Sequence, residues 1–529
     1  MKGSTGKKIL GIVLCTAMLA SLVGCGGSAV SGSGSETQNE KKTELIIGMN
    51  SDITTLDIDE GMSSATSTAC LNIFDTLTRA NSDGTIEPLL AESYEAISDT
   101  VWQFKLRQDV SFTNGEKFNA EAVKYSFDRQ VNPEYAFSLA GDYDNIDHVE
   151  IVDEYTVNFV TKEPFPMLPV WLTYLGMLPP VYTQEAGLDG FASNPIGTGP
   201  YKLVEWVKDS HLTLEANEDY FLGAPEFKTL TFKVIPEDST RILALQTGEI
   251  DIAVLVPPSQ VEQIEATEGV SVVSGPTSRP IYLGMNTIAE GPLQDVRVRQ
   301  AICYALDVSS IIDNILMGNG SQIAALALPC WEGYDESIQP YEYNPEKAKE
   351  LLEQAGYPNG EGLSFNLDIV DGEYPAIKEV AQAVAGQLAE VGINVSVITM
   401  DKSTFRATLK DKSADPLYIT GFGGMTSCAP NIMGLILSGG QRYCCYDNEV
   451  MTQLIADGTT EMDSQAFDSI WSQIQQMVID EAPASISSTA SMVFPIKLNG
   501  HLVWMKRFSH TISIFQNDIC SLLIDNFTR

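Results

Sequence analysis

The sequence predicts an α/β body made of two lobes, and three observations support this prediction. The chain has 529 residues, which exceeds the roughly 100–200 residues of one typical domain. Apolar residues make up 44% of the chain, enough to fill large hydrophobic cores. Along the body, segments that alternate like strands take turns with segments of helical periodicity, and this order is typical of α/β folds.

The first 25 residues have the pattern of an export signal followed by a lipid-attachment site. Three lysines precede an apolar run of 15 residues from Ile9 to Val23, whereas a helix that spans a bilayer needs about 20. Gly24 then precedes Cys25, as in a lipobox. We therefore expect a signal peptide at residues 1–24 and lipidation of Cys25. Cleavage without lipidation and an uncleaved anchor are the alternatives.

The segment after the signal is predicted to be a tether that leads to an acidic body. Residues 25–44 are rich in glycine and serine and then in other polar residues, which is typical of a flexible linker. The chain carries 70 acidic against 32 basic residues, a formal net charge of −38. A field of this sign repels phosphate backbones and anionic lipid head groups. The composition argues against nucleic-acid binding and favours a neutral or cationic ligand.

The cysteines do not suggest a disulfide framework. Of nine cysteines, Cys15 would leave with the signal and Cys25 would carry lipid, so seven remain. An odd number cannot pair completely, and the adjacent Cys444 and Cys445 have poor geometry for a disulfide. We expect most of the seven to be small, buried apolar side chains.

In the first half of the body, short apolar or alternating runs predict strands. A helix is expected from Phe118 to about Asp128. A second helix, from about Ser239 to Thr247, would end at Gly248, because glycine readily takes the left-handed conformation of a helix C-cap. The predicted strands cover residues 45–49, 102–106, 155–160, 230–234 and 249–253.

The second half contains a strand–helix–strand pattern. Alternating apolar residues at 363–369 and 393–397 flank a helical pattern at 377–391. A crossover of this kind predicts two parallel strands. Three further helices are expected after Asp295, which would cap the first, after Asn344 and Pro345, and over residues 464–479.

Motifs that would indicate an enzyme are missing from the sequence. It has no HExxH, no GxSxG and no P-loop. The four histidines do not share the i,i+3 or i,i+4 spacing of a helical metal pair. The acidic run from Asp142 to Asp147 lacks the glycine and distal glutamate of an EF-hand loop, so a solvated turn is the alternative to calcium binding. We expect no catalytic residue, no cofactor and no metal site.

Six blocks of the sequence match the ordered blocks of one protein family. They are Gly115–Phe127 (GEKFNAEAVKYSF), Asn194–Tyr201 (NPIGTGPY), Asn217–Phe221 (NEDYF), Leu243–Asp251 (LALQTGEID), Val296–Asp307 (VRVRQAICYALD) and Asn344–Pro358 (NPEKAKELLEQAGYP). Together they resemble the family 5 extracellular solute-binding proteins, the peptide- and nickel-type receptors of ABC importers, with Lys117 where the family usually has proline. Most of these residues are expected to form caps, turns and cores, with Gly197 and Gly199 bending the backbone.

The resemblance implies a periplasmic-binding-protein fold of type II, in the large cluster with an extra subdomain. Its two lobes would be joined by two crossover strands, with residues 45–284 and a C-terminal return at 497–529 in lobe 1 and residues 285–496 in lobe 2. A ligand that binds between the lobes would stabilise their closed form, which a permease then recognises. We expect a monomeric, lipid-anchored receptor on the extracytoplasmic face of the membrane, working with ABC permease subunits.

The same resemblance points to two ligand-facing regions, Asp57–Ser67 and Leu417–Cys428. Dipeptide-binding relatives carry a tryptophan and an aspartate in the second region, where this sequence has Phe422 and Met425. Those relatives also place a carboxylate-binding arginine between the preceding strand and helix, but residues 370–375 contain none. Losing one charge-assisted contact costs roughly 1.5–3 kcal/mol, which argues against dipeptide binding with that geometry.

The predicted ligand is therefore a neutral or cationic solute, or a longer peptide held mainly through its backbone. Asp371 or Glu373 would attract a cation, and adaptable apolar side chains would line the rest of the site. Core packing or surface exposure is the alternative for each predicted contact. The residues expected to contact the ligand are Met62, Ser63, Ser64, Phe137, Trp331, Asp371, Phe422, Met425 and Ser427.

Other functions remain open at this point. A solute sensor without transport would use the same fold. A nickel-chelate binder is weakened because residues 165–181 contain no lysine or arginine to hold a carboxylated chelator. A surface hydrolase lacks a catalytic set, and an adhesin would bind no small ligand.

Overall fold

A computed structural model describes residues 42–60, 63–81, 85–374, 376–422 and 428–497. The chain divides into two units, residues 1–42 and residues 43–529, and every described helix and strand belongs to the second unit. The predicted signal peptide, Cys25 and almost all of the tether lie outside the described residues, as does nearly all of the predicted C-terminal return. In the described part of the chain, none of the helices combines the length and the apolar character that a membrane crossing requires.

The N-terminal half of the unit begins with a strand and ends with the long strand β12. Its elements are β1 (Glu44–Met49), α1 (Ser64–Cys70), β2 (Thr78–Ala80), β3 (Ile86–Pro88), β4 (Ala91–Ser98), β5 (Val101–Leu106), α2 (Ala120–Gln130), η1 (Ala140–Tyr143), β6 (Ile146–Asp153), β7 (Thr156–Thr161), α3 (Leu168–Trp171), α4 (Pro180–Ser193), β8 (Tyr201–Val207), β9 (His211–Ala216), β10 (Thr229–Val234), α5 (Asp238–Thr247), β11 (Ile252–Ala253), η2 (Pro258–Gln260), α6 (Val261–Glu265) and β12 (Val270–Met285).

The C-terminal half is richer in helices and returns through the long strand β17. Its elements are η3 (Pro292–Gln294), α7 (Val296–Tyr304), α8 (Val308–Asn314), β13 (Gly320–Gln322), α9 (Pro345–Gln354), η4 (Pro358–Gly360), β14 (Ser364–Val370), α10 (Ile377–Glu390), β15 (Asn394–Met400), α11 (Lys402–Lys410), β16 (Leu417–Gly421), α12 (Ala429–Leu437), α13 (Glu449–Thr460), α14 (Ser464–Glu481) and β17 (Ala484–Lys497).

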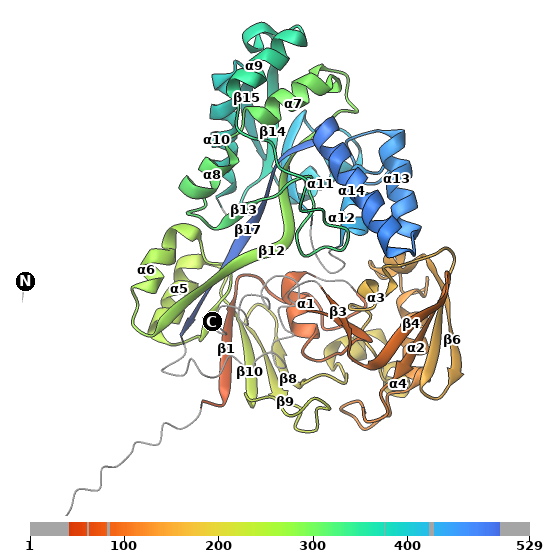
Figure 1. Cartoon of the computed structure of the whole chain (residues 1–529). Helices are drawn as coiled ribbons and strands as arrows, with labels where there is room; N and C mark the ends of the chain where they lie inside the picture. Colours follow the sequence, from red (N-terminus) through yellow and green to blue (C-terminus); the bar gives the residue numbers. More distant parts are fainter. Residues whose placement is uncertain (1–41, 61–62, 82–84, 375, 423–427, 498–529) are drawn as a thin grey trace, which may run out of the picture. The chain divides into compact units, whose positions relative to one another are not determined.

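Two long antiparallel strands, β12 and β17, connect the two halves of the large sheet (Figure 1). In the described residues this sheet has eleven strands in the order β15-β14-β16-β12-β17-β11-β1-β10-β9-β8, with β13 paired to β17 off this path. β12 pairs with β17 along most of its length, and its last residues also pair with β16. The chain thus crosses between the halves on two adjacent strands, as the fold class predicts.

Separate hydrophobic clusters lie on the two sides of these strands. One cluster packs β1, β9 and β10 residues such as Ile47 and Leu230. Another packs β14 and helix α10, with Leu367 and Val384 fully buried. Apolar burial of this extent is the main stabilising term in both halves. The structure is therefore the mixed α/β architecture that the sequence predicts.

The extra subdomain is a four-stranded antiparallel sheet in the order β4-β5-β7-β6. Its core contains edge-to-face aromatic pairs, with Phe159 contacting Phe104 at 5.4 Å and Phe127 at 6.2 Å between ring centroids. Helix α2 supplies Phe127 and begins at Asn119, whose side chain caps the amides of Glu121 and Ala122. The same apolar cluster includes Trp331 and Met433 from the C-terminal half.

The predicted strand–helix–strand crossover is confirmed. β14 and β15 are parallel, with Leu367 opposite Val397, and α10 connects them. The predicted helix caps are also present: the Asp295 carboxylate accepts from the Arg297 amide at 2.9 Å, and Gly248 ends α5 at φ 79°.

One prediction needs correction. The strand expected at 249–253 is only Ile252–Ala253, because the Glu249 and Ile250 amides still bond Ala244 in the turn that ends α5. The glycines of the 194–201 block lie at a bend of the backbone, over residues 198–200, and they also serve close packing. A Cβ on Gly197 would lie 2.1 Å from the Ile73 carbonyl oxygen, so no side chain fits there.

The described cysteines follow the prediction. Six of the seven body cysteines are described; each has a free thiol, and five are buried. Cys330 is the exposed one, and Cys520 lies outside the described residues. Burial raises the pKa of the Cys428 thiol to about 12, so this side chain stays protonated and behaves as a small apolar group.

Candidate functional site

The carboxyl ends of three parallel strands lie at one edge of the sheet in the C-terminal half. β14 is paired in parallel with both β15 and β16. In open α/β sheets, ligands bind at such an edge, beyond the carboxyl ends of the strands. Asp371 follows β14 directly, and Phe422 follows β16 directly. Two of the predicted ligand residues therefore leave the sheet at the same edge.

A buried tyrosine fixes the end of β16. The Tyr374 hydroxyl accepts from the Gly421 amide at 2.7 Å and donates to the Gly421 carbonyl at 3.0 Å. This pair of hydrogen bonds ties the loop after β14 to the last residue of β16. Phe422 comes next and stacks on Tyr443, with ring centroids 4.7 Å apart and planes inclined by 25°. The position of the Phe422 ring is thus set from both sides.

The acidic residues after β14 are paired with nearby lysines. Asp371 bonds Lys378 at 2.7 Å, and both side chains are about half exposed. Glu373 bonds Lys402 at 2.9 Å, and its side chain is only 10% exposed. We expected Asp371 or Glu373 to attract a cationic ligand. The charges of both residues are already balanced in part by these lysines.

Arg279, on strand β12, is a residue that the sequence analysis missed. Its side chain is half buried and passes the end of β16, where a Cβ on Gly421 would lie 3.3 Å from the Arg279 Cγ. The family resemblance directs attention instead to the segment between β14 and α10, where dipeptide-binding relatives carry an arginine that binds a carboxylate. The sequence does show an arginine directly before the strand pattern Pro280–Met285. It does not show that β16 is the strand that pairs with this segment.

The N-terminal half contains a second group, built on a buried ionic cluster. Arg129 on α2 binds both carboxylates of the segment after β1, with Nη1 donating to Asp57 Oδ1 at 3.0 Å and also to Asp59. All three side chains are at most 3% exposed. One guanidinium balances only one of the two carboxylates. Burial, opposed by Arg129, raises the pKa of Asp59 to about 7.

Phe137 belongs to this cluster. Its ring lies 4.9 Å from the Arg129 guanidinium carbon, a cation–π contact. The neighbouring Ser138 hydroxyl donates to the Glu60 carbonyl at 2.9 Å. The structure therefore brings together two predicted features, Phe137 and the start of the 57–67 segment, and Arg129 is the residue that joins them.

The other described residues among the predicted ligand contacts lie in a helix cap, in a helix or in a hydrophobic core. Ser63 is exposed and caps α1, its hydroxyl accepting from the Thr66 amide at 3.2 Å. Ser64 begins α1. Trp331 is 4% exposed within the apolar cluster of the subdomain, and its indole nitrogen is buried without a hydrogen-bond partner. Met62, Met425 and Ser427 lie outside the described residues.

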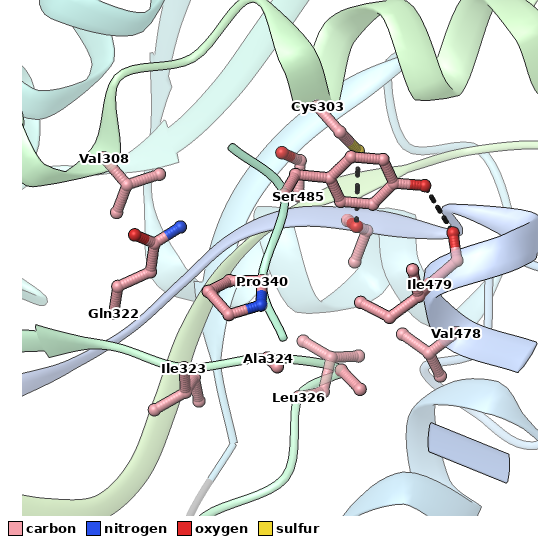
Figure 2. A pocket seen from close by; sticks show the side chains of 13 residues that line it. Cys303, Val308, Gln322, Ile323, Ala324, Leu326, Pro340, Val478, Ile479 and Ser485 are labelled. Carbon is pink, nitrogen blue, oxygen red and sulfur yellow. Dashed lines mark hydrogen bonds between the residues drawn. The ribbon is translucent and has the colours of Figure 1, made fainter. Parts of the chain in front are cut away.

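A small cavity of about 40 Å³ lies elsewhere, at the base of β17, and contains none of the predicted ligand residues (Figure 2). Cys303, Leu326 and Pro340 line it, and the Tyr341 hydroxyl at its wall donates to the Ile479 carbonyl. A space of this size holds a few water molecules rather than a solute.

The acidic run from Asp142 to Asp147, considered above for calcium binding, does not form a metal site in the described residues. In the described ranges, no group of three or more histidine, cysteine or acidic side chains could hold a metal ion. Asp147 instead contacts His148 at 2.7 Å, both on the exposed strand β6. The hydrogen bond with Asp147, together with the nearby Glu150, raises the pKa of His148, because each acidic group favours the protonated imidazole.

Comparison with known proteins identifies the class to which this fold and site belong. Residues 85–443 match the family described as bacterial extracellular solute-binding proteins, family 5 Middle. The chain belongs to this family, whose members are binding proteins of ABC importers, act outside the cytoplasm and are not enzymes. The expectation of a non-enzymatic solute-binding protein is confirmed.

Individual relatives agree with this assignment. A glutathione-binding protein GsiB from Pectobacterium atrosepticum is 30% identical over 72% of this chain and 75% of its own length. The periplasmic binding protein DppA from Helicobacter pylori, solved with the peptide STSA, is 26% identical with a TM-score of 0.71 over 86% of this chain and 94% of its own. NikA from Brucella suis, solved with Fe(III)-EDTA, is 25% identical with a TM-score of 0.78 over 86% and 95%.

Proposed function

We propose that this protein is a lipid-anchored receptor that captures an oligopeptide, or a related neutral or cationic compound, and delivers it to an ABC permease. The family match over residues 85–443 carries the proposal. Lobe 1 would comprise residues 45–284 with the return at 497–529, and lobe 2 residues 285–496. The solute would bind between the edge that carries Phe422 and the segment that Arg129 holds.

Aromatic side chains at the candidate site and the ligands named for relatives support this ligand class. Stacked rings, such as Phe422 on Tyr443, offer adaptable apolar contact. Relatives are named for glutathione or were solved with a short peptide. The NikA relative was solved with a metal chelate, so a chelate binder is the second candidate.

A thermal-shift screen with peptides, sugars and metal chelates tests the ligand class. A ligand raises the melting temperature by mass action because it binds only the folded state. Phe422→Ala should abolish the rise. Phe221→Ala is a matched control, since Phe221 is equally half buried but packs against Tyr220 at 4.7 Å and Arg107 at 4.9 Å. A rise that survives Phe422→Ala would contradict the placement of the ligand.

The anchor has its own test. Cys25→Ser should release the protein from membranes and prevent labelling with radioactive palmitate. Cys15→Ser should change neither result, because this cysteine lies inside the apolar run of the signal. Palmitate labelling of the Cys25→Ser protein would contradict lipidation at this position.

Uptake of the identified ligand should require the gene for the permease, and a sensor without transport would show binding but no uptake.

A further inference from the structure

We propose that Asp368 and Asp415 share one proton, and that this proton ties strand β14 to the start of strand β16. Asp368 lies on β14, and Asp415 lies two residues before β16. Asp371 and Phe422 follow the same two strands, so the tie lies directly behind the candidate ligand edge. The inference goes beyond the proposed function and holds for any solute, because it concerns a proton bound inside the C-terminal half.

Asp368 is a buried carboxyl group without a cation. It is 1% exposed. Its Oδ2 atom accepts from the Asp415 amide at 3.1 Å, whereas its Oδ1 atom is buried and receives no hydrogen bond from the described residues. Within the described ranges, neither Asp368 nor Asp415 takes part in an ion pair. Ionisation of Asp368 would leave a charged oxygen buried without a donor, so burial favours the protonated form.

The Asp415 side chain supplies the acceptor that a protonated Asp368 needs. The two carboxyl groups lie within hydrogen-bonding reach of each other. Ionised carboxylates can only accept, so a hydrogen bond between two carboxyl groups forms only when one of them carries a proton. Burial raises the pKa of Asp368 to about 7, and the hydrogen bond and negative charge of Asp415 add to this effect. The arrangement is that of two carboxyl groups with one proton between them.

The groups packed against Asp368 from other elements are uncharged. Its neighbour on β15 is Ile398, and its neighbour on β16 is Tyr418. Burial raises the pKa of the Tyr418 hydroxyl further above its usual value, so this side chain stays neutral. Helix α11 packs on β14 and contributes Phe405 and Leu409 to the apolar cluster that also contains Tyr418. A charge on Asp368 would therefore lie among apolar and neutral groups.

The basic residues on and after α11 do not neutralise the pair. Lys402, Arg406 and Lys410 are exposed, and the first two contact Glu373. Lys412, in the turn after the helix, donates to a backbone carbonyl. Among the described residues, Asp415 is therefore the ionisable group that acts on Asp368.

The contact between β14 and β16 is short, so a side-chain tie matters there. β14 pairs with β15 along its whole length, but with β16 only at Leu367–Leu417 and Asp368–Tyr418. Once the proton is lost, the folded protein must keep a buried charge beside a second carboxylate. Local opening hydrates both groups and removes this cost. Loss of the proton should therefore favour separation of the two strands.

The first test is the pH dependence of stability of the full chain, measured by urea denaturation from about pH 5 to about pH 8. The pKa of Asp368 rises from 3.8 to about 7 on folding, so the folded wild type binds more protons than the unfolded chain and loses this stabilisation as pH rises. Asp368→Asn stays neutral, so its urea midpoint should rise relative to wild type with pH. Asp415→Asn should show a smaller rise, because burial of Asp368 remains. Asp411→Asn, at an exposed position after α11, is the matched control and should run parallel to wild type.

The second test is hydrogen–deuterium exchange, which locates the effect. Peptides that cover residues 413–420 report on β16, and peptides that cover 394–400 report on β15. After correction for the intrinsic exchange rate, opening at 413–420 should increase between about pH 6 and about pH 8 in wild type and much less in Asp368→Asn. Opening at 394–400 should change little in either protein.

A midpoint of Asp368→Asn that runs parallel to wild type over this pH range overturns the proposal. If Asp368→Asn does not fold, Asp415→Asn and the exchange of the wild type decide. A wild type whose opening at 413–420 does not depend on pH then overturns the proposal as well. None of these measurements uses a solute, so their failure leaves the receptor function standing.

Discussion

The two candidate ligand faces hold their charges in opposite ways. In the N-terminal half, Arg129, Asp57 and Asp59 are buried and bound to one another. In the C-terminal half, Asp371 and Lys378 are about half exposed and pair in contact with water. Removing one partner of a buried pair strands the other charge in a medium that solvates it poorly, whereas exposed pairs contribute little. The first face is therefore a rigid frame, and the second can adjust its charges to a ligand.

The sharpest way to break this contrast is Arg129→Met. The substitution leaves the carboxylates of Asp57 and Asp59 buried without their cation, and we expect the free energy of unfolding to fall by about 3–5 kcal/mol. Urea denaturation followed by circular dichroism measures the change. A decrease in the free energy of unfolding below about 1 kcal/mol, the range of exposed pairs, would show that the cluster does not hold the segment after β1 in place.

Gly421→Ala should have the next largest effect. The new Cβ would lie 2.9 Å from the Pro280 carbonyl oxygen. Because paired strands can shift only slightly, we expect the free energy of unfolding to fall by about 1–3 kcal/mol. Gly434→Ala in α12 is the control, because its Cβ meets only Ile455 at 3.6 Å. Alanine in a helix interior should there stabilise by up to about 1 kcal/mol. Equal effects of the two substitutions would contradict the close approach at β16.

A pH titration of Asp59→Asn sharpens the comparison further. Burial raises the pKa of Asp59 from 3.8 to about 7, so between these values the folded state binds more protons than the unfolded state. Asp59 therefore lowers the stability of the wild type as pH rises through this window. Asp59→Asn removes that contribution, so the stability of this variant relative to wild type should increase as the pH rises from about 4 to about 8. Parallel stability curves would contradict the raised pKa.

The smallest effect is expected for Lys378→Met. Both side chains of its pair with Asp371 are about half exposed, and such pairs contribute up to about 1 kcal/mol. The same denaturation experiment as for Arg129→Met gives the comparison. A loss that approaches the Arg129→Met value would remove the distinction between the two faces.

Local pattern explains which parts of the fold could be predicted. The alternation in β14 and β15 and the caps at Asp295 and Gly248 depend on neighbours in the sequence, so they were predicted correctly. Arg129 and Asp57 are 72 residues apart, and no local signal pairs them. Likewise, Arg279 reaches the ligand edge only because β12 pairs with β16. The family resemblance proposed both faces, and tertiary pairing decides which charges they contain.

The strand order has a consequence for how the chain completes itself. β17 lies between β12 and β11, and Ile496 of β17 pairs with Ile252 of β11. A fragment that ends at Met285 would leave a vacant slot in the middle of its sheet, with two unsatisfied edges open to other chains. The first half therefore stays unfinished until nearly the last described residues are made. We therefore expect a nascent chain to complete this sheet only after the residues of β17 have been made.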